Sequence, residues 1–321
     1  MPKVSIVMTL YNTPFEYLDK TIKSLLNQTF KDFEFIIIDD ASSIPYQDYF
    51  KNLNDDRIKY YKLENNKGSA NARNIGIQKA VGEYIASADS DDVYMLDRLT
   101  KQVEFLDKNP DIGLISSSYV QSNNGKVPKM LLEDEDIKVF MLFNSPFANP
   151  SATYRKKIME EHGIKLDPSL RFGEDYALWM DFMFAGIKMA NLADVLFEYT
   201  RRKGQLSQAI FDKQYQVLSY LYKKMLAKIG IEATDDEINL HYKIYRKNLL
   251  EFDKDEIETW LNKIINANKT AKLFDEQRLI AKKDSILEEY DKLKNRLFKI
   301  KIGKMNFCLS KQFKIYIERR Y

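Results

Sequence analysis

The chain is 321 residues long, with 45% hydrophobic and 30% charged residues, and this ordinary globular composition excludes a mostly disordered protein. Its 11 Gly fall well below the usual share of roughly 7%, which argues against collagen-like, glycine-rich and small all-β designs and indicates much helix. The net charge of +3 is small, so the whole chain does not have the charge of a nucleic-acid binder.

The first half of the chain alternates strand-like and helix-like patterns. Residues 4–9 form a short apolar β-rich run, and residues 33–38 are nearly all apolar, as in a strand buried on both faces of a sheet. Between these runs, Thr13, Pro14 and Glu16 predict a helix with an N-cap, a proline at its first position and a capping-box glutamate.

Two more strands, at residues 58–62 and 83–88, flank a helix expected from about Ala70 to Ala80. Repeated β–α units of this length predict an α/β fold with a mostly parallel, Rossmann-like sheet and helices on both faces. The later elements are expected to be a strand at 112–117, a helix at 134–143, a strand near 150–154, a helix ending at 184 and a strand-rich stretch to 199.

Polar side chains follow three of these strands. They are Thr9 with Tyr11 and Asn12, the pair Asp39 and Asp40, and the run Asp89, Ser90, Asp91 and Asp92. Ligands bind at the carboxyl edge of open α/β sheets, so three polar strand ends that converge there predict a binding site.

The Asp-Ser-Asp-Asp run has two interpretations. It can cap a helix, because an Asp before a helix satisfies free N–H groups. It can also hold a divalent metal through carboxylate oxygens and share that metal with a diphosphate. Its place after a buried strand, with Asp40 at the end of another, favours the metal.

Residues 65–73 also have two interpretations. They can be a turn followed by a helix with one exposed arginine, Arg73. Alternatively, the helix N-terminus and Arg73 face an anionic nucleotide. The residues alone leave both open.

Glu174 and Asp175 begin a helix, where they can complement its dipole or supply a general base. Trp179 lies four residues after Asp175 and on the same helical face. Its indole can pack in the core or against a sugar ring.

The ordered segments VSIVMTLYN, FEFIIIDDAS, NNKGSANARNIGI, GEYIASADSDD and GEDYALW resemble family-2 inverting glycosyltransferases with the GT-A fold. The resemblance covers residues 1 to about 207. It implies a nucleotide-sugar-binding and catalytic GT-A domain at 1–206. The charged, helical sequence that follows predicts a mainly helical region at 207–321 that ends in a basic tail, 292–321.

The resemblance implies a donor site at matching positions. Thr9, Tyr11, Asn12 and Asp40 would hold the base of a nucleotide, usually uridine. Arg73 would lie near the base or diphosphate, Asp89 would contact the ribose with Ser90 beside it, and Asp91 would ligate Mn²⁺ or Mg²⁺.

The resemblance also makes Asp175 the catalytic base, with Glu174 as the alternative. Family members often have a Tyr-Arg-x-His-like segment after the last core strand, and here residues 199–203 (YTRRK) depart from it, with Lys203 near the expected histidine. A cationic lid over the diphosphate is therefore expected in place of a histidine–metal contact. The acceptor or lid candidates are Glu174, Trp179, Arg201 and Lys203.

The implied reaction is inverting, metal-dependent transfer of a hexose or N-acetylhexosamine from a UDP-sugar to a hydroxyl of a glycan or lipid-linked acceptor, in bacterial surface polysaccharide synthesis. A sugar-nucleotide nucleotidyltransferase is an alternative, but it would be expected to have a glycine-rich phosphate loop, and residues 10–18 contain no Gly. A dinucleotide oxidoreductase is disfavoured by the same absence. A non-catalytic sugar-nucleotide-binding protein stays open, and no nucleic-acid partner is expected.

The tail from Asp291 to Tyr321 carries a net charge of +8, against −5 for the rest of the chain. Apolar residues alternate with charged ones in 298–302 and 313–317, which predicts strands or an extended segment. These segments either pack on the helical region or attach the protein to an anionic membrane.

Several features predict a cytoplasmic protein, peripheral at most to the inner face of the cell membrane. Cys308 is the single cysteine, which excludes an intramolecular disulfide and a cysteine-based metal site. His162 and His241 stand far apart in the sequence, which disfavours a zinc site with several histidines. No apolar run approaches the roughly 20 residues of a membrane span, and the strand-like start leaves no room for a signal peptide.

Overall fold

The structure is a computed structural model that describes residues 1–201 and 211–296, without the side chains of 211–214. It divides into two compact units, Met1–Leu221 and Tyr222–Tyr321, and the division falls inside helix α9 (Phe211–Lys228). The boundary predicted at 206/207 lies outside the described residues.

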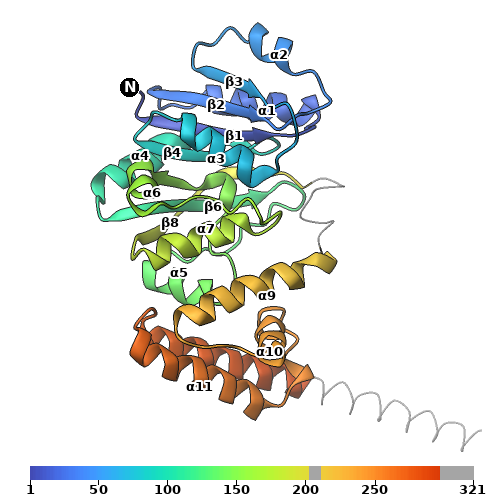
Figure 1. Cartoon of the computed structure of the whole chain (residues 1–321), viewed down its shortest axis with the longest axis vertical. Helices are drawn as coiled ribbons and strands as arrows, with labels where there is room; N and C mark the ends of the chain where they lie inside the picture. Colours follow the sequence, from blue (N-terminus) through green and yellow to red (C-terminus); the bar gives the residue numbers. More distant parts are fainter. Residues whose placement is uncertain (202–210, 297–321) are drawn as a thin grey trace, which may run out of the picture. The chain divides into compact units, whose positions relative to one another are not determined.

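The first unit is built on one eight-stranded sheet with the order β3-β2-β1-β4-β7-β6-β8-β5 (Figure 1). Strands β1, β2, β3 and β4 are parallel neighbours, and β6 is parallel to β8. The short strands β7 and β5 pair antiparallel with their neighbours. The strands are β1 (Val4–Leu10), β2 (Phe33–Asp39), β3 (Ile58–Lys62), β4 (Tyr84–Asp89), β5 (Val93–Tyr94), β6 (Ile112–Gln121), β7 (Thr153–Arg155) and β8 (Lys188–Tyr199).

Helices cover both faces of this sheet. Because side chains alternate along a strand, Ile6 and Met8 of β1 face one side, where they share a buried cluster with apolar residues of α1 and α4. Val7 faces the other side and meets α3 at Gly76, where a Cβ would lie only 2.5 Å from Val7 Cγ1. The glycine therefore lets α3 approach the sheet closely, and the expected α/β architecture is confirmed. The helices of this unit are α1 (Phe15–Leu26), α2 (Gln47–Asn52), α3 (Ser69–Lys79), α4 (Arg98–Lys108), α5 (Asp134–Met141), η1 (Asn149–Ser151), α6 (Lys156–His162) and α7 (Glu174–Phe184).

The predicted capping box at the start of α1 is wrong. Helix α1 begins at Phe15 after Pro14, and no side chain caps it. The Thr13 hydroxyl instead lies 2.6 Å from the Ser90 hydroxyl, so a tertiary hydrogen bond takes the place of the local one. The sequence patterns also missed α4, α6 and β5.

The described part of the second unit is helical, as expected. It contains α10 (Asp235–Tyr245), η2 (Leu249–Glu251), α11 (Lys254–Ala271) and helical residues 276–296. In its core, the Trp260 indole N–H donates to Nδ1 of the fully buried His241 at 3.1 Å. Across 1–201 and 211–296, no helix is long and apolar enough to cross a membrane. The alternating segments of the basic tail, 298–302 and 313–317, lie outside the described residues.

Candidate functional site

The carboxyl ends of β2, β1 and β4 meet at one edge of the sheet. These strands are parallel neighbours, and their register places Thr9 beside both Ile38 and Asp89. The three polar strand ends predicted from the sequence are therefore brought together, with Thr9 between the acidic ends of its neighbours.

Asn12 ties the loop after β1 to the loop after β2. Its backbone N–H donates to Ser42 Oγ at 3.0 Å, and its Oδ1 accepts from both the N–H and the hydroxyl of Ser43 at 2.9 Å. Its φ of 51° is in the left-handed region, which Asn tolerates better than most residues. The Tyr11 side chain next to it is 55% exposed and offers an open aromatic face at this edge.

Asp40 organises the turn that leads into α3. Its two carboxylate oxygens accept the backbone N–H groups of Lys67 (2.7 Å) and Gly68 (2.8 Å), and the residue is only 3% exposed. Gly68 has φ 85°, a conformation that favours glycine. Asp40 thus positions the start of α3, and its contact with a nucleotide base stays a prediction.

Arg73 projects from α3 into the protein rather than into solvent. The residue is 3% exposed, and its Nη2 lies 2.9 Å from Oδ1 of Asp89. With the amide of Asn149 turned so that its oxygen faces the guanidinium, that oxygen accepts from Nη2 at 3.1 Å and from Nη1 at 3.2 Å. The interpretation of Arg73 as an exposed helix residue is wrong, because the arginine is a buried partner of Asp89.

Three nearby carboxylates favour the charged form of Arg73. Burial lowers the pKa of its guanidinium, but Asp89 and Glu174, together with Asp175, raise it further than burial lowers it. Burial, with help from Asp91 and Asp175, raises the pKa of Asp89 to about 6 against the opposing effect of Arg73. One buried cation therefore lies within electrostatic reach of both the strand-end carboxylate and the Glu174–Asp175 pair.

Glu174 and Asp175 form the first turn of α7. Burial raises the pKa of Glu174 to about 7, the neighbouring Asp175 adds to the increase, and Arg73 opposes it. Burial also raises the pKa of Asp175, while the backbone N–H of Tyr176 donates to its Oδ1 at 2.8 Å and lowers it. Ser69 at the start of α3 has a small opposing effect and lowers the pKa of Glu174. A carboxyl pair whose pKa is raised toward neutrality is typical of general base sites.

Trp179 belongs to the core and not to the site. Its side chain is fully buried, and its ring meets Phe147 edge-on at a centroid distance of 5.6 Å and Tyr154 at 6.5 Å. Of the two interpretations of Trp179, packing in the core is confirmed and packing against a sugar is wrong, because no face of the ring is open.

Hydrogen bonds from three other segments of the chain fix the loop after β4. Ser90 is 8% exposed, and its hydroxyl forms a hydrogen bond with the Thr13 hydroxyl. Asp92 is 1% exposed, its Oδ1 accepts the backbone N–H of Thr200 at 2.8 Å, and its carbonyl accepts the Thr21 hydroxyl at 2.7 Å. These contacts restrain Ser90 and Asp92, the two residues that flank Asp91.

A buried arginine that sequence reasoning missed supports this loop. Arg98 of α4 is fully buried, and its Nη2 donates to the Ser87 carbonyl of β4 at 2.7 Å. Its guanidinium lies 4.7 Å from the centre of the Tyr94 ring, and the Tyr94 hydroxyl accepts the N–H of Asp89 at 2.7 Å. Burial lowers the pKa of Arg98 to about 10, so it is still charged at neutral pH beneath the acidic loop.

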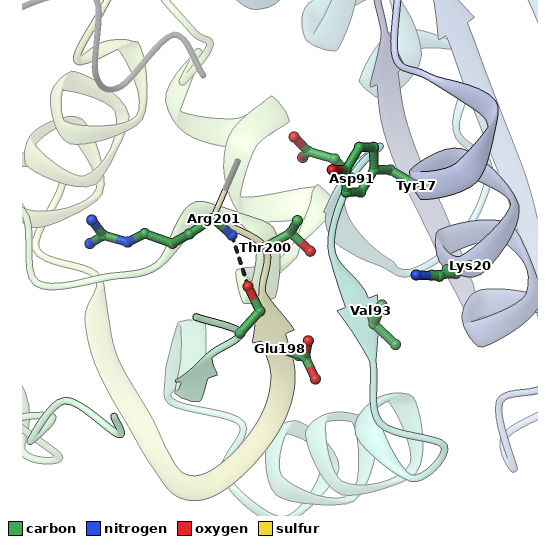
Figure 2. A pocket seen from close by; sticks show the side chains of 8 residues that line it. Tyr17, Lys20, Asp91, Val93, Glu198, Thr200 and Arg201 are labelled. Atoms are coloured by element: carbon green, nitrogen blue, oxygen red, sulfur yellow. Dashed lines mark hydrogen bonds between the residues drawn. The ribbon is translucent and has the colours of Figure 1, made fainter. Parts of the chain in front are cut away.

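Asp91 lines a pocket of about 180 Å³ (Figure 2). Tyr17 and Lys20 of α1 form one wall, and Glu198, Thr200 and Arg201 at the end of β8 form another. The backbone N–H of Arg201 donates to Ser122 Oγ at 2.9 Å, and Figure 2 shows its guanidinium extending away from Asp91. Lys203 lies outside the described residues.

The Asp91 carboxylate fits a divalent cation only if phosphate oxygens of a ligand supply most of the other ligands. Within residues 1–201 and 211–296, no group of three or more His, Cys, Asp or Glu could hold a metal ion. Asp91 offers carboxylate oxygen, the donor type that Mg²⁺ and Mn²⁺ prefer, and such ions often take one or two carboxylates with phosphate oxygens completing the shell.

Comparisons with known proteins agree with this geometry. The family model described as glycosyl transferase family 2 matches residues 5–163. A Methanocaldococcus jannaschii protein described as the uncharacterized glycosyltransferase MJ1057 is 33% identical over 224 residues, which cover 67% of this chain and 77% of the relative.

Two further matches concern proteins with described ligands or substrates. The Escherichia coli UDP-Glc:alpha-D-GlcNAc-diphosphoundecaprenol beta-1,3-glucosyltransferase WfaP is 29% identical over 257 residues, covering 75% of this chain and 92% of that protein. The solved structure of S. aureus TarS 1–349 in complex with UDP-GlcNAc superposes with a TM-score of 0.63 at 20% identity, covering 90% of this chain and 92% of TarS 1–349. The match to TarS shows a shared fold.

Proposed function

The chain belongs to glycosyltransferase family 2, and from that premise we propose that it transfers a hexose or N-acetylhexosamine from a UDP-sugar, with inversion, to a hydroxyl of a glycan or lipid-linked acceptor. The observation that carries the proposal is the buried Arg73, which joins the strand-end Asp89 to the Glu174–Asp175 pair. The proposed donor site and the proposed base would thereby share one electrostatic network.

The donor nucleotide is proposed to lie along the edge formed by β2, β1 and β4. The exposed Tyr11 ring is proposed to contact the base, with Thr9 and Asn12 beside it, while Asp40 holds the turn before α3. Asp89, whose side chain is 35% exposed, is free on one side to accept a ribose hydroxyl. Uridine is favoured because the names of WfaP and of the TarS complex both specify a UDP-sugar.

Asp175 is proposed to act as the general base. It would accept the proton of the acceptor hydroxyl as that oxygen attacks C1 of the donor sugar from the face opposite UDP, which inverts the configuration in one displacement. Glu174 is the alternative base. The positive charge of Arg73 favours the ionised form of the pair, which is the form able to accept a proton.

Asp91 is proposed to hold Mn²⁺ or Mg²⁺ together with the donor diphosphate. The metal, when bound, neutralises negative charge that develops on the leaving UDP. Lys20 and Arg201 line the same pocket and are proposed, together with Lys203, to supply a cationic lid over the diphosphate once the donor is bound.

The acceptor is proposed to be a glycan or a lipid-linked sugar in bacterial surface polysaccharide synthesis. This proposal depends on WfaP, whose name specifies an acceptor sugar on diphosphoundecaprenol. A cytoplasmic location is proposed with it, and peripheral attachment of the basic tail to an anionic membrane would bring the site close to such an acceptor.

A donor screen tests the proposed function. The protein is incubated with MnCl₂ and a panel of UDP-, GDP- and dTDP-sugars, with a GlcNAc-diphosphate lipid analogue as acceptor, and release of the nucleoside diphosphate is measured. We expect metal-dependent release from one or two UDP-sugars. Release from no donor in the panel, with or without the acceptor, would contradict the proposal.

A further inference from the structure

Thr13 makes a buried connection between two loops of the candidate site. Its hydroxyl lies 2.6 Å from the Ser90 hydroxyl, although the two residues are 77 positions apart in the chain. Thr13 is 2% exposed and Ser90 is 8% exposed, so water has little access to either hydroxyl. Each of the two buried hydroxyl groups is therefore satisfied by the other.

The backbone of Thr13 is held independently of its side chain. The Tyr46 hydroxyl donates to the Thr13 carbonyl at 2.6 Å, and Tyr46 is itself fully buried. The Tyr46 ring packs edge-on against Phe15, the first residue of α1, at a centroid distance of 5.3 Å. Thr13 is thus a fixed point from which its hydroxyl reaches the loop after β4.

Ser90 is the residue between Asp89 and Asp91. Its hydroxyl bond to Thr13 restrains the backbone from which the two flanking carboxylates project. We propose that Thr13 is a positioning residue for the donor diphosphate and its metal, which acts by holding Ser90 so that Asp89 and Asp91 face the ligand together. This inference rests on the proposed function, because it takes the loop after β4 to be the diphosphate-binding loop.

The expected effect is modest and specific to ligand binding. Loss of one buried hydrogen bond leaves Ser90 without its partner and gives the loop freedom that it must lose again when ligand binds. We expect Thr13→Val, which keeps the shape of the side chain and removes the hydroxyl, to weaken binding by about 3- to 10-fold. Thr13→Ser restores the hydroxyl and is expected to bind like the wild type.

Thr29 provides a matched control. Its hydroxyl lies 2.7 Å from that of Thr100, 71 positions away, so Thr29→Val removes a threonine hydroxyl pair of similar span. That pair is exposed and joins the segment after α1 to α4, and the Thr29 hydroxyl also donates to the Leu96 carbonyl at 3.0 Å, without a bond to Ser90. We expect Thr29→Val to leave ligand binding unchanged.

The experiment is calorimetric titration of the full chain with UDP in MnCl₂, with thermal unfolding and the donor KM and kcat measured on the same variants. We expect Thr13→Val to weaken UDP binding and raise the donor KM with little change in kcat, and Thr13→Ser to restore both. Binding by Thr13→Val within twofold of the wild type would overturn the inference, even if the midpoint of unfolding falls, because Thr13 would then act on stability alone. Equal weakening by Thr13→Ser or Thr29→Val would also overturn it. A wild type that binds no UDP would overturn the proposed function, and this inference with it.

Discussion

Replacing Arg73 by methionine is expected to move the acidic limb of the pH–rate profile to higher pH. Arg73 lowers the pKa of both Glu174 and Asp175, so its removal raises the pKa of each. The base must be ionised to accept a proton. A higher pKa of the base therefore lowers activity at neutral pH and has less effect on activity at alkaline pH.

The size of the effect follows from the pKa of about 7 for Glu174. An opposite charge within about 4–6 Å lowers a carboxyl pKa by about 1–3 units. Burial and Asp175 each change the pKa of Glu174 more than Arg73 does. We therefore take the lower end of this range, about one pKa unit, as the effect of Arg73. At pH 7 the ionised fraction of such a group would fall from about one half to about one tenth, a loss of roughly fivefold. The limb reports an apparent pKa of the coupled pair and not of either residue alone.

The assay is UDP release in the presence of acceptor, measured from pH 5.5 to 9.5 under saturating donor. Arg73→Lys keeps the charge and is expected to leave the limb close to its wild-type position. Arg57→Met is a matched control, because Arg57 is also ion-paired, with Asp55 at 2.6 Å, and lies before β3 at the opposite edge of the sheet. An acidic limb that stays in place in Arg73→Met would refute the electrostatic coupling of Arg73 to the pair.

Three further substitutions or deletions test other parts of the site. Asp175→Asn is expected to reduce transfer by about 10²–10⁴-fold while UDP binding survives, and a larger loss in Glu174→Gln would assign the base to Glu174 instead. Asp91→Ala is expected to abolish the metal dependence of transfer with little change in the midpoint of thermal unfolding, whereas wild-type turnover and metal response would remove Asp91 from the site. Deletion of residues 292–321 is expected to abolish salt-sensitive sedimentation with anionic liposomes and to spare donor hydrolysis; equal sedimentation of both forms would exclude the tail as the membrane contact.

The sequence predicted the strand ends well because local patterns determine them. Apolar runs define β1, β2 and β4, and the polar residues that follow each run come to one edge in any parallel arrangement of these strands. The resemblance to family-2 glycosyltransferases was confirmed by the family model and by the relatives. The assigned roles of Asp40, Asp89, Asp91 and Asp175 stay predictions.

Contacts between distant segments were not predictable in this way. Asn149 reaches Arg73 because β7, which begins two residues after η1, pairs antiparallel with β4. No hydrophobic periodicity in the sequence predicts that pairing. Thr13 precedes a proline and a glutamate at capping spacing, yet its hydroxyl pairs with Ser90 because β1 and β4 are neighbours. Trp179 could not be assigned from its helical position, since burial depends on Phe147 and Tyr154 from other elements.

The configuration of the product tests the central claim most directly. A UDP-α-sugar that passes the donor screen is incubated with the GlcNAc-diphosphate lipid analogue, and the anomeric configuration of the new linkage is read from the product by NMR. One displacement with Asp175 as base predicts a β-linked product from the wild type and almost none from Asp175→Asn. An α-linked product, or a β-linked product formed at an equal rate by Asp175→Asn, would contradict the account.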